Sequence, residues 1–260
     1  RWTDLAGTAI SASEGFVGQA ELDIRPRLRT GEVLEVVPGL IVTQHSGTGK
    51  SNQMFLRGFN LDHGTDFSTS IDGMPVNLPS HGHGQGYTDL NFLIPELIES
   101  VEFRKGPYHA SVGDFSSTGS SHLSTFRTLP ESILKLGIGQ DGHRQLLVAD
   151  SVNVGSGSLL YAAQGHVYDG PWVDIREDLQ RVNGMLRYSQ QSGSSSEWDV
   201  MLMGYDASWN SPDQVAKRAI DSGLVDRLGS LDTTIGGETS RYSVSGSLLR
   251  PMGNDRQLHA

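Results

Sequence analysis

Downstream of Pro130, apolar and polar side chains alternate along the chain with the period of a β-strand. The segments are close to the ten-residue length with which a tilted strand crosses a bilayer, so the pattern predicts antiparallel transmembrane β-strands. The apolar positions are Leu134, Leu136 and Ile138; Leu159, Tyr161, Ala163, Gly165 and Val167; Val182, Gly184, Leu186 and Tyr188; Trp198, Val200, Leu202 and Gly204; Tyr242, Val244, Gly246 and Leu248. The opposite positions include Lys135, Gln164, His166, Asn183, Arg187, Asp199, Ser243 and Ser245.

The connections between these strands alternate in length. The first, third and fifth connections, at 140–144, 169–180 and 207–240, hold 5, 12 and 34 residues. The second, fourth and sixth, at 155–157, 191–196 and 251–255, hold 3, 6 and 5 residues. Outer-membrane barrels show this asymmetry, with short periplasmic turns and longer outer loops. A secreted β-sandwich also alternates in polarity, so a soluble β-rich binding module with an α/β neighbour is the alternative. The strand expected at 146–154 is less regular than the others, because Asp150 lies among its apolar positions. We interpret this irregularity as a bulge or a shifted register.

Upstream of Pro130, helix and strand signals are mixed. Residues 53–57, 67–71 and 100–104 have strand patterns, and Asp72-Gly73 predicts a hairpin turn. Residues 30–37 predict a short helix that Thr30 caps and that ends at Pro38-Gly39. The sequence therefore predicts a small domain of mixed helices and strands before the purely β region.

Composition narrows the classes of partner and site. The formal net charge of −10 disfavours a nucleic-acid partner, because phosphate binding needs a concentrated basic face. The chain has no cysteine, which rules out disulfides and thiolate metal sites. It has no run of 18 apolar residues, so no transmembrane helix is expected.

Several short blocks in the first half of the chain occur in a specific order. In that order they resemble the plug domain of TonB-dependent outer-membrane receptors, over roughly residues 20–128. The blocks are Val-Pro-Gly-Leu (37–40), Gln-Met-Phe-Leu-Arg-Gly-Phe (53–59), Ser-Ile-Asp-Gly-Met-Pro-Val (70–76), Ile-Glu-Ser-Val-Glu-Phe-Arg-Lys-Gly-Pro (98–107) and Val112-Gly113.

The resemblance implies an α+β plug domain at 20–128, preceded by an N-terminal segment at 1–19. The first six to seven strands of an outer-membrane β-barrel would follow at 129–260. Plugged barrels need about 22 strands, so we expect a fragment of a longer receptor. The implied function is TonB-dependent uptake of a scarce nutrient, such as a siderophore or metal chelate, across the outer membrane of a Gram-negative bacterium. The implied partners are TonB, the small ligand and outer-membrane lipid, with no cofactor and no enzymatic activity.

The resemblance also assigns roles to particular residues. Plug arginines in this family contact acidic barrel residues, so Arg57 and Arg104 are candidates for plug–barrel contacts. Lys105 stands where the family usually has arginine, and lysine cannot make the same bidentate contact. The family uses an N-terminal TonB box that pairs with its partner by strand addition. The candidate box is Asp4, Leu5, Ala6, Gly7 and Thr8.

Histidines lie on both sides of the block at 70–76. His81 and His83 lie in a glycine-rich loop and are candidate metal ligands, because imidazoles and carboxylates suit zinc, copper or iron. His63 and Asp66 are further candidates for binding the ligand, and the same domain also holds His45, Asp62 and Asp89. In such receptors the loops after the Asp-Gly hairpin lie near the outward face of the plug, where substrate first binds. The alternative is a water-exposed polar loop whose histidines have no ligand.

One further block suggests a different chemistry. Residues 47–51 read Gly-Thr-Gly-Lys-Ser and resemble part of a phosphate-binding loop, but that motif requires glycine at position 44, which is Gln44. An NTPase is therefore a weak alternative, and a flexible loop is the preferred interpretation. No G-x-S-x-G elbow occurs, which disfavours a hydrolase.

Overall fold

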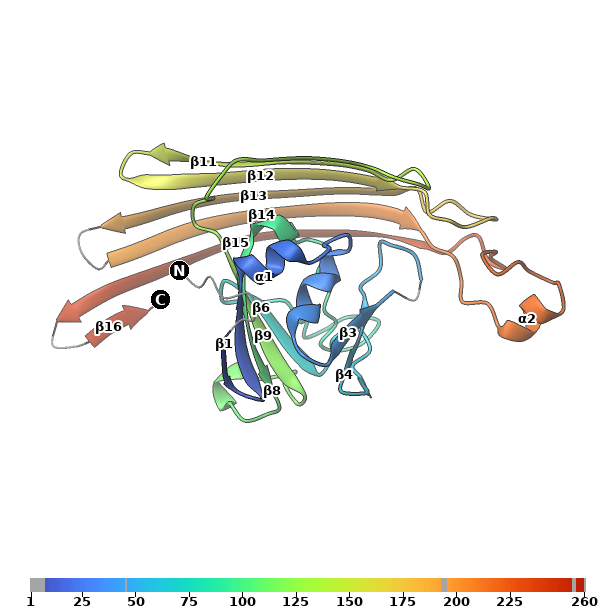
Figure 1. The fold of residues 1–260 in the computed structure, drawn as a ribbon, viewed down its shortest axis with the longest axis horizontal. Coiled ribbons are helices and arrows are strands. Elements are labelled where there is room, and N and C mark those ends of the chain that lie inside the picture. Colours follow the sequence, from blue (N-terminus) through green and yellow to red (C-terminus); the bar gives the residue numbers. More distant parts are fainter. Residues whose placement is uncertain (1–7, 45, 193–195, 254–255, 260) are drawn as a thin grey trace. The chain divides into compact units, whose positions relative to one another are not determined.

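The computed structural model describes residues 8–44, 46–192, 196–253 and 256–259. The chain forms two compact units (Figure 1). Unit 1 comprises residues 1–45 and 50–126, and unit 2 comprises residues 46–49 and 127–260. The sequence placed the boundary near Thr128, within two residues of the end of unit 1. No helix among the described residues is long and apolar enough to cross a membrane.

Unit 1 is built on a six-stranded sheet with the order β1-β2-β8-β9-β6-β7. Its neighbours are antiparallel except β6 and β9, which are parallel. The strands are β1 (Thr8–Ser11), β2 (Glu14–Gly18), β6 (Phe67–Ile71), β7 (Met74–Pro75), β8 (Ile98–Lys105) and β9 (Gly119–Thr125). The connecting helices are α1 (Gln19–Ile24) and the 3-10 turns η1 (Thr30–Val36), η2 (Pro95–Leu97) and η3 (Ala110–Val112).

A three-stranded sheet completes unit 1, formed by β3 (Leu40–Thr43), β4 (Gln53–Leu56) and β5 (Phe59–Asn60). The hairpin between β4 and β5 turns at Arg57 and Gly58, whose φ angles are 52° and 82°. Two consecutive positive φ values are characteristic of a type I′ turn, which matches the twist of the flanking strands. The arginine-glycine pair of the block at 53–59 is therefore a tight hairpin turn.

The interior of unit 1 is apolar. Several of its helices and strands contribute side chains that are at most 1% exposed, as expected where alternate or helically spaced residues face a common core. They include Leu22, Leu34, Val37, Met54, Leu61, Phe67, Ile71, Leu93, Leu97, Ile98, Val101 and Leu123.

Two expectations for the first forty residues need correction. Residues 8–18, expected in a segment before the plug, are strands β1 and β2 of the main sheet, where β2 pairs with β8 from Glu14–Arg104 to Gly18–Ser100. The predicted helix at 30–37 is a 3-10 helix that Arg29 caps in place of Thr30, because the Glu32 carboxylate accepts the Arg29 backbone N–H at 3.1 Å.

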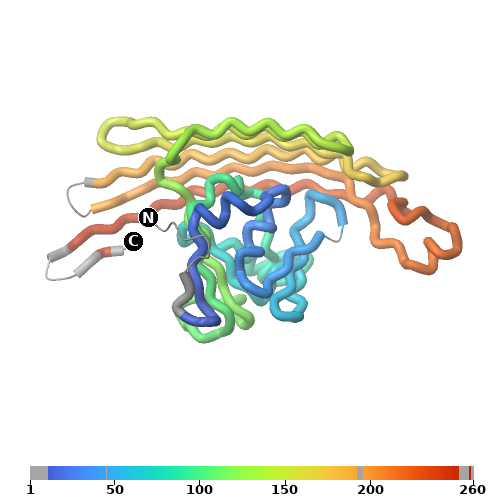
Figure 2. The backbone as a smooth tube through the Cα atoms, in the orientation of Figure 1, coloured from blue at the N-terminus to red at the C-terminus, as the bar shows by residue number. Residues whose placement is uncertain are grey.

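Unit 2 is a seven-stranded antiparallel meander in which each strand pairs with the next along the chain. The long strands run side by side and curve together (Figure 2). They are β10 (Ile133–Ile138), β11 (Arg144–Val154), β12 (Gly157–Tyr168), β13 (Leu179–Ser192), β14 (Ser196–Asn210), β15 (Gly236–Gly253) and β16 (Arg256–His259). The helix α2 (Lys217–Asp221) lies in the long connection between β14 and β15.

The long strands expose apolar side chains and bury polar ones. Leu134, Leu136 and Ile138 are 72–79% exposed, and the apolar faces of the following strands are also exposed. The opposite face buries polar side chains, namely Gln164, His166, Arg181, Asn183, Arg187, Ser189 and Asp199, together with apolar ones such as Leu147, Leu160, Met185, Met201 and Met203. Water would disfavour this arrangement, whereas lipid outside a polar lumen favours it. The rows of exposed apolar side chains and the buried charges on the opposite face contradict a soluble β-sandwich, whose inward faces are apolar.

The buried polar face is bonded internally. Arg187 Nε donates to the Asp199 carboxylate at 2.8 Å, and both side chains are at most 5% exposed. The Ser247 hydroxyl donates to the same carboxylate. A charge removed from water needs such a partner, so this pair ties β13, β14 and β15 together.

The bulge predicted at Asp150 is wrong. The pairing of β11 with β12 continues without a shift through Asp150–Tyr161. Asp150 therefore stays on the same face as its exposed neighbours Val148 and Val152. Its carboxylate accepts the backbone N–H of Ser151 at 2.7 Å, which gives it a partner without disturbing the strand.

The segment 46–49 does not form a phosphate-binding loop. Its Thr48 N–H donates to the Glu177 carboxylate at 2.6 Å, so an anion-binding donor is already occupied by an acid of unit 2. Gly49 lies against the indole of Trp209, where a Cβ atom would come within 2.0 Å of the ring. The element that follows is strand β4 rather than the helix that a phosphate loop requires.

Candidate functional site

Asp62 and His63 lie in a tight turn directly after β5. The turn is fixed by local hydrogen bonds: the Asp62 N–H donates to Asn60 Oδ1 at 2.9 Å, and the Gly64 N–H donates to the Leu61 carbonyl at 2.8 Å. Asp62 has a φ of 49°, a left-handed conformation that aspartate and asparagine tolerate better than most residues. The turn places the Asp62 carboxylate and the His63 ring next to each other.

The ring of His63 is fully buried and oriented by a backbone carbonyl. Its Nδ1 lies 3.1 Å from the carbonyl oxygen of Asn52. A carbonyl only accepts, so Nδ1 carries the proton and Nε2 of the neutral ring carries the lone pair. This Nε2 lies 3.7 Å from Asp62 Oδ1. The Thr88 N–H donates to the His63 carbonyl at 2.8 Å, which fixes the backbone as well.

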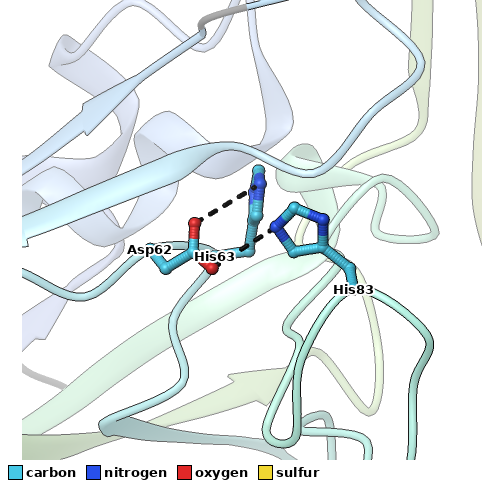
Figure 3. Close-up of side chains that lie close together, drawn as sticks. All are labelled: Asp62, His63 and His83. Carbon is cyan, nitrogen blue, oxygen red and sulfur yellow. Dashed lines mark ion pairs between the residues drawn. The ribbon is translucent and has the colours of Figure 1, made fainter.

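His83 reaches the same carboxylate from a second loop. Its Nε2 lies 3.3 Å from Asp62 Oδ2, and its ring centroid lies 4.5 Å from that of His63 (Figure 3). One ligand atom from each of Asp62, His63 and His83 can be chosen so that all three lie within 4.8 Å of one another. We call these three residues the Asp-His-His cluster.

Asn77 holds the two loops together. Its buried amide nitrogen donates to the carbonyls of Gly64, Phe67 and Gly86, each at 3.1 Å, and its Oδ1 accepts the Thr69 N–H at 2.7 Å. Gly64 follows the Asp62–His63 turn, whereas Gly86 closes the loop that carries His83. A single buried side chain thus joins the His83 loop to the Asp62–His63 turn.

His81 lies beside this cluster and has a different contact. Its ring stacks on Tyr87 with centroids 4.0 Å apart, and its Nδ1 accepts the His83 backbone N–H at 3.2 Å. The sequence paired His81 with His83 as metal ligands, whereas the structure groups His83 with Asp62 and His63. Burial, followed by the nearby Asp89 carboxylate, raises the pKa of Tyr87 to about 12, so its phenol stays protonated at neutral pH.

The other sequence-predicted residues lie outside the Asp-His-His cluster. Asp66 uses its carboxylate to accept the Ser117 hydroxyl at 2.8 Å, and its carbonyl accepts the Thr118 hydroxyl at 2.7 Å. Arg104 pairs with Glu102 at 2.9 Å on β8. Arg57 is exposed at the tip of its hairpin and is not enclosed by the apolar residues around it in the sequence.

Of the candidate TonB box, residues Asp4, Leu5, Ala6 and Gly7 lie outside the described part of the chain. Thr8 is the first residue of β1 and pairs with Phe16 of β2.

The sequence placed Asp62 only among the further carboxylates of the plug that could supply a ligand, and it assigned no role to Asn52 or Asn77. The only sequence signal at Asp62 is its residue type, because carboxylates are among the ligands of zinc. Asn52 acts through its backbone carbonyl, which no side-chain pattern reveals. Asn77 acts through contacts with residues distant in sequence.

Comparison with known proteins identifies the first unit. The family model described as "TonB-dependent Receptor Plug Domain" matches residues 6–120. Residues 6–120 are a TonB-dependent receptor plug domain. The resemblance seen in the sequence is confirmed, and the match includes β1 and β2.

Relatives extend the comparison beyond the plug domain. The vitamin B12 transporter BtuB of Vibrio vulnificus (strain CMCP6) is 26% identical over 212 residues, which cover 76% of this chain and 34% of the relative. The copper transporter OprC has a TM-score of 0.71 at 13% identity, over 97% of this chain and 37% of that one. The unliganded ferric citrate transporter FecA has a TM-score of 0.72 at 16% identity, over 98% and 39%.

These structures confirm the predicted fold class, a plug domain followed by antiparallel barrel strands. The chain spans about a third of the length of the BtuB relative that it matches. The seven strands of unit 2 form an open sheet in which β10 and β16 are the edges.

Proposed function

We propose that the chain is part of an outer-membrane receptor that takes up a scarce small ligand by TonB-dependent transport in a Gram-negative bacterium. One observation supports this most directly: the plug domain is followed by strands that expose apolar side chains and bury polar ones. A receptor barrel in lipid needs this distribution, and a catalytic function would not require it. The relatives support transport in general, because their names refer to vitamin B12, copper and ferric citrate.

The proposed energy-transducing partner is TonB, and the proposed contact is the segment from Asp4 to Thr8. Strand addition uses backbone donors and acceptors of an extended peptide. Ala6→Pro would remove one backbone donor from this segment. We expect ligand accumulation to fall while surface binding of the ligand persists. Ala6→Ser, which keeps the N–H, is the matched control, and unchanged accumulation in Ala6→Pro would contradict a contact at this segment.

Arg57 and Arg104 remain the proposed plug–barrel contacts, and the environment of Lys105 supports an anionic partner in this region. Lys105 is 7% exposed. Burial lowers the pKa of its ammonium group, and the neighbouring positive charge of Arg57 lowers that pKa further. An approaching carboxylate would offset both effects.

The test of transport uses the full-length protein in cells with and without a functional TonB complex. Cells are supplied separately with radiolabelled vitamin B12, ferric citrate and a copper salt, the ligands named for the relatives, and with a zinc salt. The expected result is outer-membrane fractionation and accumulation of one ligand only when TonB is functional. Recovery of the protein in the soluble periplasmic fraction would contradict the proposal and favour a soluble binding module.

A further inference from the structure

We propose that the Asp-His-His cluster binds one divalent transition-metal ion, Zn²⁺ or Cu²⁺, through Asp62, His63 and His83. This inference rests on the proposed function in one respect: the ion, alone or within a chelate, would be the cargo that the plug domain captures. The coordination itself depends only on the residues of unit 1.

The separations between the ligand atoms fit a small ion. Zinc is bound at about 2.0–2.2 Å by nitrogen and oxygen, so neighbouring ligands of a tetrahedral ion lie roughly 3.3 Å apart. The observed distances to the two Asp62 oxygens are 3.3 Å from His83 Nε2 and 3.7 Å from His63 Nε2. The cluster is therefore close to the geometry that coordination requires.

His63 has the support that metal-binding histidines usually have. Such a histidine donates its second ring N–H to a carboxylate or carbonyl, which fixes the tautomer and directs the other nitrogen at the ion. The contact of His63 Nδ1 with the Asn52 carbonyl at 3.1 Å provides this orientation. Burial of the ring further restricts its movement, so His63 is the preoriented ligand of the three.

His83 is the ligand that can adjust. Its side chain is 35% exposed, and the preceding Gly82 lies in open space, where an added Cβ atom would meet nothing within 4 Å. A small movement of His83 would bring its ring nitrogen closer to that of His63. The site thus combines a fixed ligand, a carboxylate in a tight turn and an adjustable ligand at the surface.

The chemistry of the ligands selects the class of ion. Two imidazoles and one carboxylate suit zinc and copper, whereas magnesium and calcium prefer an all-oxygen shell. Three protein ligands leave a coordination position for water or for a donor atom of a chelate. An open position is suited to transient capture, since a closed four-ligand site would retain the ion.

Calorimetric titration of the purified full-length protein in detergent with ZnCl₂ and CuCl₂ tests the site. Asp62→Asn removes the charge and suits the left-handed backbone, because asparagine also tolerates positive φ. His83→Ala removes an exposed ring. His109→Ala is the matched control, because His109 is also 35% exposed and pairs with one carboxylate, Glu14, at 2.7 Å. His81→Ala tests the stacked histidine.

We expect one ion to bind wild type, with at least about tenfold weaker affinity in Asp62→Asn and in His83→Ala. His109→Ala and His81→Ala should bind as wild type does. Wild-type protein that binds neither ion, or equal affinity in wild type, Asp62→Asn and His83→Ala, would overturn the site. Weakened binding in His81→Ala alone would also overturn it. The titration requires no TonB, so a negative titration would not contradict the proposed transport function. A negative transport assay would likewise not contradict metal binding measured by titration.

Discussion

The interior of unit 1 is apolar, whereas the long strands of unit 2 place rows of apolar side chains outside and bury charged and amide side chains among apolar ones inside. Phe67, Ile71 and Leu123 are fully buried in the plug domain, yet Leu134 and Val244 on the barrel strands are more than 70% exposed. The two units use the same alternation along their strands. The difference lies in what surrounds each sheet.

This contrast shows that exposure has to be interpreted together with the surrounding medium. Exposure of an apolar side chain is unfavourable in water but not in hydrocarbon. A buried polar side chain needs partners in both settings. In the plug domain Asn77 meets this need through backbone groups, and in unit 2 the Arg187–Asp199 pair meets it through opposite charges.

The largest expected effect comes from opening a cavity in the plug domain. Phe67→Ala should destabilise unit 1 by about 3–5 kcal/mol, because the ring is fully buried and the site cannot close completely. Leu202→Ala, at a side chain 44% exposed on β14, should cost less. Hydrogen exchange of the full-length protein in lipid would measure local opening in both units. Equal losses of stability in Phe67→Ala and Leu202→Ala would contradict the contrast between the two interiors.

Removal of one member of the buried ion pair should have a nearly similar effect in unit 2. Asp199→Ala should cost about 3–5 kcal/mol, because Arg187 loses its buried carboxylate. The double variant Arg187→Met/Asp199→Leu should recover much of this loss, since well-packed apolar residues often replace such pairs. Chemical denaturation in liposomes measures the free energy of unfolding of the single and the double variant. No recovery in the double variant would indicate that the polar contacts of this face are needed individually.

A charge on an exposed apolar position distinguishes lipid from water. Leu202→Arg should cost about 2–4 kcal/mol if its position lies near the middle of the bilayer. Ile41→Arg, at a 57% exposed position on β3 of the plug domain, is the matched control and should stay within about 0.5 kcal/mol. Denaturation of both variants in liposomes gives the comparison. Equal small costs would indicate that the apolar face of β14 is in contact with water.

The smallest effect appears only at high pH. The pKa of Tyr87 is about 12 in the folded protein against about 10 for an unperturbed phenol. The folded state therefore holds this proton more tightly, so the contribution to stability is fully present below pH 10 and is lost as pH rises towards 12. The difference in tyrosinate absorbance between wild type and Tyr87→Phe reports this titration. A midpoint near pH 10 would contradict the burial of the phenol.

The sequence by itself determined the fold class and most strand positions of unit 2. Period-two alternation located β10 to β15 without any tertiary contact, because the two faces of each strand meet different media. The sequence defined the ends of these strands less well. The connection expected at 207–240 is shorter, since β14 continues to Asn210 and β15 begins at Gly236. Backbone pairing such as Ser208–Glu238 extends the strands beyond the apolar pattern.

Only the tertiary structure decided which side chains form the candidate site. A spacing of two residues put His81 and His83 on one side of an extended chain, but the loop turns there and His81 stacks on Tyr87. His83 instead meets Asp62 and His63, which precede it by about twenty residues. The contacts of Asn77 and the orientation of His63 by the Asn52 carbonyl produce this meeting. Such contacts depend on backbone groups that every residue carries, so no pattern of side chains along the sequence can reveal them.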